Sequence, residues 1–183
     1  MKIVLFVCQG NVFRSPVAEA ILNKKLSELG LSDSIICISR GIQGQSEVSA
    51  PKYNRFDLYV DEYQLAESVF RESNIDISNH VSKPMDLETL QSADLIIALG
   101  DAILNGAGGI NGYGEGVTKK TIIYEIPDPF EESGLNKYRV VVPKIMSIVD
   151  ELTPTIIDLL VDSELNSELG LAPKNGGLKE RLL

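Results

Sequence analysis

The sequence predicts a single doubly wound α/β domain, in which helices flank a four-stranded parallel sheet of strand order 2-1-3-4. Four short apolar runs lack the polar alternation of a half-exposed strand, which is typical of strands buried on both faces of a parallel sheet. Stretches with a helical period separate these runs, which is the pattern of right-handed βαβ units. The length of 183 residues suits one core of ordinary size.

The predicted strands follow one another with a crossover after each. They lie at residues 3–7, 34–39, 93–99 and 121–125. In the order 2-1-3-4 the sheet has a switch point between strands one and three, where open α/β sheets bind their ligands. The loop after the first strand therefore falls at the expected ligand site.

The predicted helices are amphipathic, with apolar residues on one face. They cover residues 18–29, 59–72, 86–92, 135–152 and 155–169. Pro16 suits the first turn of the first helix, and Gly30 suits its C-terminal cap. Pro143 predicts that the fourth of these helices either starts near Val140 or kinks.

Residues 100–116 contain seven glycines, which suggests either a phosphate-binding loop or a mobile surface loop. A phosphate-binding loop needs the spacing Gly-x-Gly-x-x-Gly between a strand and a helix, or glycines followed by Lys-Ser/Thr, and this segment has neither pattern. The high chain entropy of glycine favours the mobile surface loop.

Composition limits the function. The net charge of −9 argues against nucleic acid or an anionic membrane as a partner, so any anion site must be local. Two cysteines, Cys8 and Cys37, give neither a disulfide framework nor metal-ligand spacing. No apolar stretch is long enough to cross a membrane. We expect a cytoplasmic protein without metal or cofactor; the sequence leaves its oligomeric state open.

One thiol and one guanidinium stand at the two ends of the loop after the first strand. Cys8 directly follows the predicted strand at residues 3–7, and Arg14 lies just before the helix start that Pro16 marks. The free N–H groups and the dipole of a helix N-terminus favour an oxyanion and a thiolate. Gly10 lets the backbone turn, and Asn11 tolerates a left-handed conformation. The pattern predicts a cysteine that attacks an oxyanion ester, although a lone cysteine in a strand is more often a core residue.

This loop resembles the signature of the low-molecular-weight protein tyrosine phosphatase family, Cys-x-Gly-Asn-x-Cys-Arg-Ser-Pro. The matching positions are Cys8, Gly10, Asn11, Arg14, Ser15 and Pro16. Phe13 departs from the signature, because many members have a second cysteine there. The resemblance covers residues 1–152 and implies a flavodoxin-like fold and phosphomonoester hydrolysis through a phosphocysteine intermediate.

The resemblance also implies roles for particular residues. Cys8 corresponds to the nucleophile, Arg14 to the phosphoryl-binding group and Asp128 to the general acid. The phosphate-binding loop comprises Gln9, Gly10, Asn11, Val12, Phe13 and Ser15, and the supporting residues are Ser39 and His80. By itself, Pro-Asp-Pro at 127–129 predicts only a turn; the family places its acid in an Asp-Pro pair after the last strand.

The expected partner is a phosphorylated protein or a small aryl phosphate. Phe130 can stack on a phenyl ring, and Tyr53, Phe56 or Tyr59 can supply the opposite face of a substrate wall. Val12 is aliphatic as in tyrosine-directed members, whereas the phosphoarginine branch is expected to have a threonine. An acidic residue after Phe130 partly resembles that branch, so a protein arginine phosphatase stays an alternative.

Two further alternatives are an arsenate reductase and a non-catalytic oxyanion-binding module. The reductase needs two more cysteines downstream, and residues 79–100 contain none. A binding module has no use for the acid Asp128. The predicted organisation is a phosphatase-like domain at residues 1–153, followed by a C-terminal helical extension and tail at 154–183.

Overall fold

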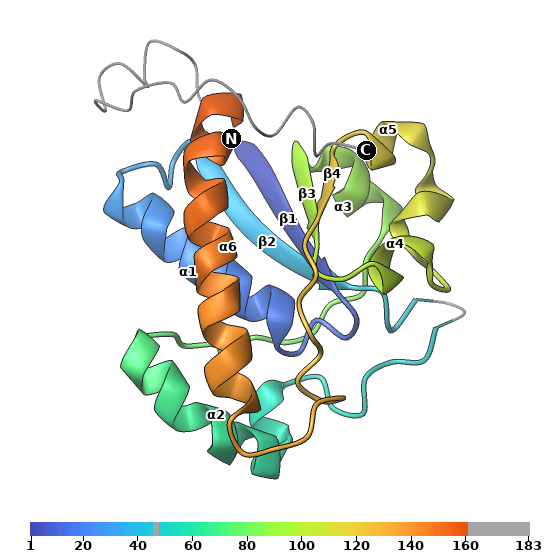
Figure 1. The fold of residues 1–183 in the computed structure, drawn as a ribbon. Coiled ribbons are helices and arrows are strands. Elements are labelled where there is room, and N and C mark those ends of the chain that lie inside the picture. Colours follow the sequence, from blue (N-terminus) through green and yellow to red (C-terminus); the bar gives the residue numbers. More distant parts are fainter. Residues whose placement is uncertain (46–47, 161–183) are drawn as a thin grey trace.

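The computed structural model describes residues 1–45 and 48–160 of the chain. Its strands are β1 (Lys2–Cys8), β2 (Ile35–Gly41), β3 (Leu95–Ala98) and β4 (Thr121–Ile123). All pairings are parallel and the order is β2-β1-β3-β4, which confirms the predicted sheet (Figure 1). The switch point lies between β1 and β3, at the end of the strand that carries Cys8.

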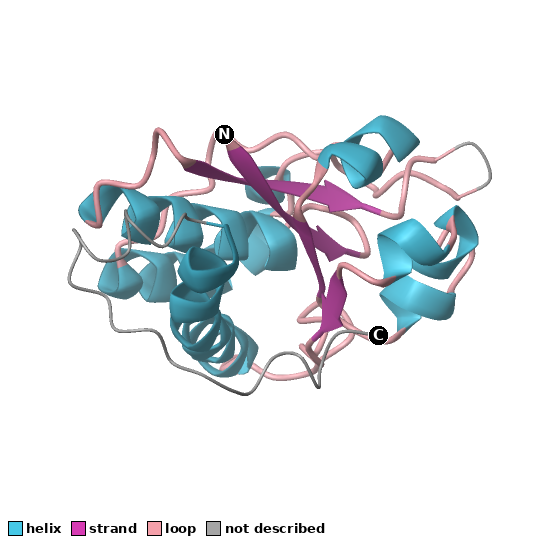
Figure 2. Ribbon diagram, turned by 90° about the horizontal axis from the view of Figure 1, so that it is seen from above, coloured by secondary structure: helices cyan, strands magenta, loops and turns pink. Residues whose placement is uncertain are grey.

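Helices cover both faces of the sheet (Figure 2). One face carries α1 (Arg14–Glu28), α2 (Val60–Ser73) and α6 (Lys137–Leu160). A short 3-10 helix, η1 (Phe56–Leu58), comes directly before α2 on the same face. The other face carries α3 (Leu87–Ser92), α4 (Ala102–Asn105), η2 (Ile110–Tyr113) and α5 (Glu115–Thr118). The architecture is therefore the predicted three-layer arrangement.

The central strand β1 contributes to two apolar cores at once. Val4 and Phe6 point into the larger core on the side of α1, α2 and α6, while Leu5 and Val7 point into the smaller core. All four side chains are fully buried. Because successive side chains of a strand alternate between faces, this double burial fixes both the position and the rotation of the strand. Cys8 is thereby held at a defined place at its end.

The prediction that β2 is buried on both faces is wrong. Its burial alternates: Ile35 and Cys37 are buried, whereas Ile36 and Ile38 are only half-buried. The reason is position, because β2 is an edge strand and the helices of the smaller core cover its second face only in part. An apolar run alone does not distinguish a central strand from an edge strand.

The prediction of a mobile surface loop at residues 100–116 is also wrong, since α4, η2 and the start of α5 lie there. Ile103, Leu104, Ile110 and Val117 are buried in the smaller core and anchor this segment. Its glycines serve the tight connections between these short elements; Gly108 and Gly114 have positive φ values.

Helix α6 is longer than predicted. It begins at Lys137, before Val140, and continues through Pro143 and Pro154 to Leu160. Each proline removes one backbone hydrogen bond, but the buried apolar side of the helix keeps it in place on the larger core. The helix crosses the boundary that the sequence suggested at 153–154, and Ile156 and Ile157 are buried in the same core. The rest of the predicted helix 155–169 lies outside the described residues.

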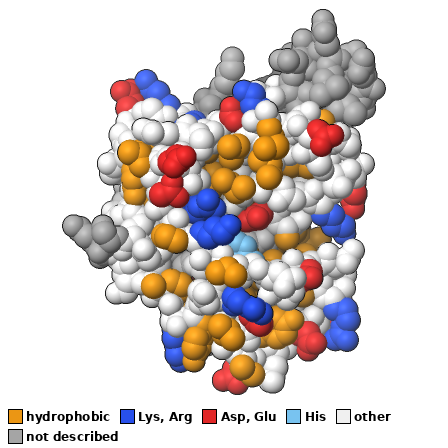
Figure 3. Space-filling model, turned by 180° about the vertical axis from the view of Figure 1, so that it is seen from behind, with side chains coloured by type: hydrophobic (Ala, Val, Ile, Leu, Met, Phe, Trp, Pro, Cys, Tyr) orange, Lys and Arg blue, Asp and Glu red, His pale blue; other side chains and the backbone are white. Residues whose placement is uncertain are grey.

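The face of the molecule opposite to that in Figure 1 carries apolar side chains scattered among charged ones (Figure 3). Isolated apolar side chains of this kind are normal for a protein surface. None of the described helices combines the length and the apolar character needed to cross a membrane.

Candidate active site

The loop at the centre of the site joins β1 to α1. Cys8 is the last residue of β1, and α1 begins at Arg14. Phe13, the N-cap residue, makes no side-chain capping hydrogen bond, and the first turn of α1 contains no acidic residue. The backbone N–H groups of this turn and the positive end of the helix dipole are therefore left for an external anion.

The sulfur of Cys8 lies beside two polar groups of the loop. The Ser15 hydroxyl is 3.0 Å from Sγ, and the Asn11 backbone N–H donates to Sγ at 3.3 Å. Cys8 is only 2% exposed. The sulfur is thus enclosed by polar groups of residues 8–15 at the bottom of the loop. Ser15, a member of the predicted phosphate-binding loop, therefore contacts the thiol directly.

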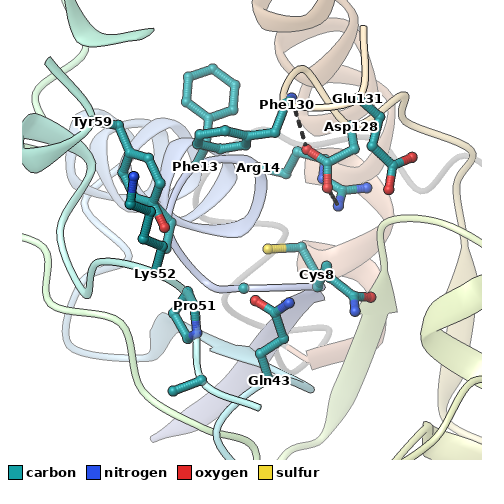
Figure 4. Close-up of a pocket in the computed structure, with 14 residues that line it drawn as sticks. Cys8, Phe13, Arg14, Gln43, Pro51, Lys52, Tyr59, Asp128, Phe130 and Glu131 are labelled. Carbon is teal, nitrogen blue, oxygen red and sulfur yellow. Dashed lines mark hydrogen bonds and ion pairs between the residues drawn. The ribbon is translucent and has the colours of Figure 1, made fainter. Parts of the chain in front are cut away.

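Arg14 connects the loop with two other segments of the chain. Its Nη1 donates to the carbonyl oxygens of Leu99 and Ile126, both at 3.2 Å, and its Nη2 forms an ion pair with Asp128. The guanidinium is almost fully buried. These bonds fix its plane at the carboxyl ends of β3 and β4 and bring Asp128 over the loop. Cys8, Arg14 and Asp128 line one cavity of about 330 Å³ (Figure 4).

Asn11 is the centre of a hydrogen-bond network that supports the loop. It has the predicted left-handed conformation, with a φ of 50°. Its Nδ2 donates to the hydroxyls of Ser15 at 3.0 Å and Ser39 at 2.7 Å. Its Oδ1 accepts from the backbone N–H of Lys83 at 2.8 Å and lies 3.1 Å from His80 Nε2. The loop is therefore tied to β2 and to the segment before α3.

Ser39 and His80 lie beside this network, where the resemblance places them. Ser39 donates to the Glu19 carboxylate of α1, a partner that the sequence did not reveal. Burial lowers the pKa of His80, while the charge of Glu19 partly opposes this shift. A neutral imidazole that donates Nε2–H to Asn11 supports the loop without taking part in proton transfer.

Beside the catalytic loop, the glycine that leaves least room for a Cβ is Gly41, at the end of β2. A Cβ there would lie 2.8 Å from the Asn11 nitrogen and from the Gly10 carbonyl carbon, which are both rigid backbone atoms. At Gly10, which the sequence singled out, a Cβ would meet only the flexible end of Gln43, at 2.9 Å. The close approach of β2 to the loop thus depends on Gly41, which the loop signature does not include.

Phe13 fills space in the larger core. Its ring lies 4.9 Å from those of Phe56 and Tyr138 and 5.8 Å from that of Phe70. The residue that replaces the second cysteine of the signature is therefore packed by η1, α2 and α6. These contacts explain why the loop accommodates a large aromatic side chain.

The substrate side of the cavity differs from the prediction. Tyr59 and Phe130 line it, together with Gln43, Lys52 and Glu131 (Figure 4). The rings of Tyr59 and Phe130 contact each other, with centroids 4.9 Å apart, so they form one aromatic side and not two opposed faces.

Tyr53 is not among the residues that line the cavity. It packs edge-on against Tyr59 instead, and its backbone is bonded to the Tyr59 hydroxyl. The sequence missed the cavity positions of Gln43 and Lys52, because the long loop after β2 carries no pattern that indicates which side chains turn inward. Among the described residues, no group of His, Cys, Asp and Glu could hold a metal ion.

The doubly wound sheet, the anion-binding loop and the thiol, guanidinium and carboxylate in one cavity define the class of phosphatases that use a cysteine nucleophile. Residues 3–163 match the family model described as low molecular weight phosphotyrosine protein phosphatase, and the chain belongs to this family. Its members are hydrolases, and a phosphocysteine intermediate is typical of them.

Relatives of the chain include phosphatases named for two different phosphorylated residues. The low molecular weight protein-tyrosine-phosphatase PtpA of Staphylococcus epidermidis is 28% identical over 160 residues, which are 84% of this chain and 93% of that protein. The protein-arginine-phosphatase of Bacillus subtilis is 32% identical over 96 residues, 52% of this chain and 54% of that protein. The crystal structure of YfkJ from Bacillus subtilis superposes with a TM-score of 0.66 at 23% identity, covering 86% of this chain and 96% of that one.

Proposed function

We propose that the protein is a protein tyrosine phosphatase in which Cys8 is the nucleophile, Arg14 the phosphoryl-binding group and Asp128 the general acid. The observation that carries the proposal is the meeting of these three side chains in one cavity, although Asp128 lies far from the other two in the sequence. A module that only binds oxyanions would have no use for a carboxylate facing the bound anion. The free thiols of Cys8 and Cys37 suit a reducing compartment, and we place the protein in the cytoplasm.

The reaction follows from the positions of these groups. The Cys8 thiolate attacks phosphorus, the bond to the leaving oxygen breaks, and Asp128 gives that oxygen a proton. Arg14 and the backbone N–H groups of the loop stabilise the negative charge on the three remaining oxygens. A water molecule then attacks the phosphocysteine and gives a proton to Asp128, while the electron pair of the P–S bond returns to sulfur.

Phosphotyrosine is the substrate that the cavity suits best. Tyr59 and Phe130 offer an aromatic side against which a phenyl ring can pack, and aliphatic Val12 lies in the loop. One observation favours phosphoarginine as the second candidate. The carboxylates of Asp128 and Glu131 both line the cavity, and such a pair is suited to a guanidinium.

The experiment that tests the proposal combines active-site variants with two kinds of substrate. Cys8→Ser and Arg14→Ala should abolish hydrolysis of p-nitrophenyl phosphate while circular dichroism shows an unchanged fold. The wild-type protein should release phosphate from phosphotyrosine peptides much faster than from phosphoarginine peptides. Near-normal turnover by either variant would contradict the assigned site, and the reverse peptide preference would make the protein an arginine phosphatase.

A further inference from the structure

Gln43 lies in the cavity, but neither the loop signature nor the acid motif includes it. Its side chain lines the cavity together with Cys8, Arg14 and Asp128. Figure 4 shows the amide reaching toward Cys8 from below, whereas Asp128 lies above Cys8 in this view. A polar group thus faces the reacting sulfur from the side away from the acid.

The backbone of Gln43 is fixed to the catalytic loop. Beyond the end of β2, the Ile42 N–H donates to the Cys8 carbonyl at 3.2 Å and the Gln43 N–H donates to the Gln9 carbonyl at 2.9 Å. Gly41 permits this close approach, because any side chain there would collide with the backbone of the loop. The side chain of Gln43 therefore starts from a rigid base.

The amide of Gln43 has no hydrogen-bond partner among the described residues, whereas the polar side chains that support the loop are bonded to one another. The residue is half-buried, and its Oε1 lies 2.9 Å from the point where a Cβ on Gly10 would be. A partly buried amide without a partner is unfavourable unless water or a ligand bonds to it. Because the amide faces the cavity, a water or ligand that bonds to it would lie in the cavity.

In the second step of the reaction the attacking water must be held in a fixed orientation, and Asp128 alone cannot fix it. The attacking water has two protons, and Asp128 can accept only one of them. A second acceptor would fix the direction of the water's lone pair toward phosphorus. This acceptor should be neutral, because another carboxylate would repel the phosphoryl oxygens, and it must not take the proton itself. The carbonyl oxygen of a glutamine amide meets both conditions.

We infer that Gln43 positions the water that hydrolyses the phosphocysteine intermediate, by accepting its second proton in a hydrogen bond through Oε1. The inference rests on the proposed function. In this step the water oxygen bonds to phosphorus, the P–S bond breaks with its electron pair going to Cys8, and one proton passes to Asp128. The first step does not involve water, so Gln43 should affect only the second.

An alcohol provides a test that separates this role from a structural one. An alcohol that attacks the phosphocysteine has a single hydroxyl proton, which Asp128 takes, so its attack has no need of Gln43. Removal of the amide should therefore slow transfer to water and leave transfer to glycerol nearly unchanged. The ratio of p-nitrophenol released to inorganic phosphate formed measures this partition directly.

The variant is Gln43→Met, which keeps the length of the side chain and removes its donor and acceptor. The matched control is Gln45→Met, the same change in the same loop at a residue that does not line the cavity. The full-length proteins are mixed rapidly with p-nitrophenyl phosphate, with and without glycerol. We expect a normal burst of p-nitrophenol, a loss of about five- to tenfold in the rate of phosphocysteine hydrolysis, and a similar rise in the product ratio with glycerol. Gln45→Met should behave like the wild type.

Two results would overturn the inference. One is an unchanged hydrolysis rate and product ratio in Gln43→Met. The other is an equal loss in the burst and in hydrolysis, which would indicate phosphoryl binding or a disturbed cavity. Failure of the proposed function would look different, because the wild-type protein itself would then give no burst and no phosphocysteine.

Discussion

The two sides of the active-site cavity are built in different ways. The loop at residues 8–15 is held by hydrogen bonds from β2, α1 and the segment before α3, with Asn11 at their centre. The aromatic side, formed by Tyr59 and Phe130, is held mainly by ring contacts, and Phe130 is 39% exposed. Directional bonds define the reacting groups, whereas the substrate side can adapt its shape. We propose that the loop determines the chemistry and that the aromatic side determines the substrate.

The largest expected effect is inactivation by peroxide, because the loop has Phe13 where the family signature has a second cysteine. We predict that peroxide inactivates the enzyme and that dithiothreitol recovers little activity, because no neighbouring thiol can protect an oxidised Cys8. Cys37 pairs with Val4 on β1, four positions from Cys8, or about 13 Å along the strand. A disulfide needs Cα atoms about 6 Å apart. Burial also raises the pKa of the Cys37 thiol, which keeps it unreactive.

Cys37→Ala is the control for this experiment, and activity after peroxide and then dithiothreitol is the measurement. The variant should lose activity as irreversibly as the wild type. Full recovery in the wild type that disappears in Cys37→Ala would show that the two thiols do meet.

The next largest effect is expected from Asn11→Ala, which tests whether the hydrogen bonds of the loop matter for catalysis. Asn11→Ala removes the central amide and leaves a non-glycine residue at positive φ without local support, at a cost of about 2–3 kcal/mol in the free energy of unfolding. It should also lower kcat/KM for p-nitrophenyl phosphate, because the loop loses its fixed shape. Denaturant unfolding and steady-state kinetics measure the two effects.

Asn74→Ala is the matched control for Asn11→Ala. Asn74 has nearly the same φ, 51°, but caps the C-terminus of α2 and lies outside the cavity. It should lose stability without a loss of kcat/KM. If both variants keep full activity, the network around Asn11 serves stability alone.

A smaller effect is expected on the aromatic side. Tyr59→Ala removes one ring of the pair and should raise KM for a phosphotyrosine peptide by about tenfold, the equivalent of one lost aromatic contact of ~1.4 kcal/mol. kcat for the same peptide should change little, since the loop is untouched. Tyr53→Ala, a neighbouring tyrosine that does not line the cavity, is the control. A loss in kcat without a change in KM would contradict the division between the two sides.

The smallest effect is the pH dependence of stability through His80. Burial lowers the pKa of His80 in the folded state below its ordinary value of 6.5. Between the two pKa values the unfolded chain binds more protons, so stability falls as pH falls below about 6.5. Unfolding of the wild type and of His80→Gln at pH 5 to 7.5 should show a weaker pH dependence in the variant. If the free energy of unfolding depends on pH equally in both proteins, His80 is not the source of the pH dependence.

The two sides also differ in how far the sequence predicted them. The loop is one continuous stretch between a strand and a helix, so its residue types and their spacing identify Cys8 and Arg14 as candidates and place them at the switch point. The left-handed Asn11 follows from its residue type and is confirmed. The sheet order was predictable because its crossovers follow general rules.

The aromatic side depends on contacts between segments far apart in the chain, and these leave no local pattern. Tyr53 and Tyr59 are only six residues apart, and nothing in the sequence indicates that Tyr59 lines the cavity while Tyr53 does not. For the same reason the sequence did not predict that the Gln43 side chain lines the cavity or that β2 approaches the catalytic loop closely at Gly41. In the glycine-rich segment 100–116, three buried side chains and Val117 directly after it outweigh the preference of glycine for disorder.

The central claim is that the loop and Asp128 form one active site. The most direct test compares kcat/KM of Asp128→Asn with that of the wild type for p-nitrophenyl phosphate and for a phosphotyrosine peptide. p-Nitrophenolate departs with little protonation, whereas the tyrosine oxygen needs a proton as its bond breaks. We predict a loss for the peptide at least about tenfold larger than for p-nitrophenyl phosphate. An equal loss on both substrates would contradict this prediction and remove Asp128 from the acid role.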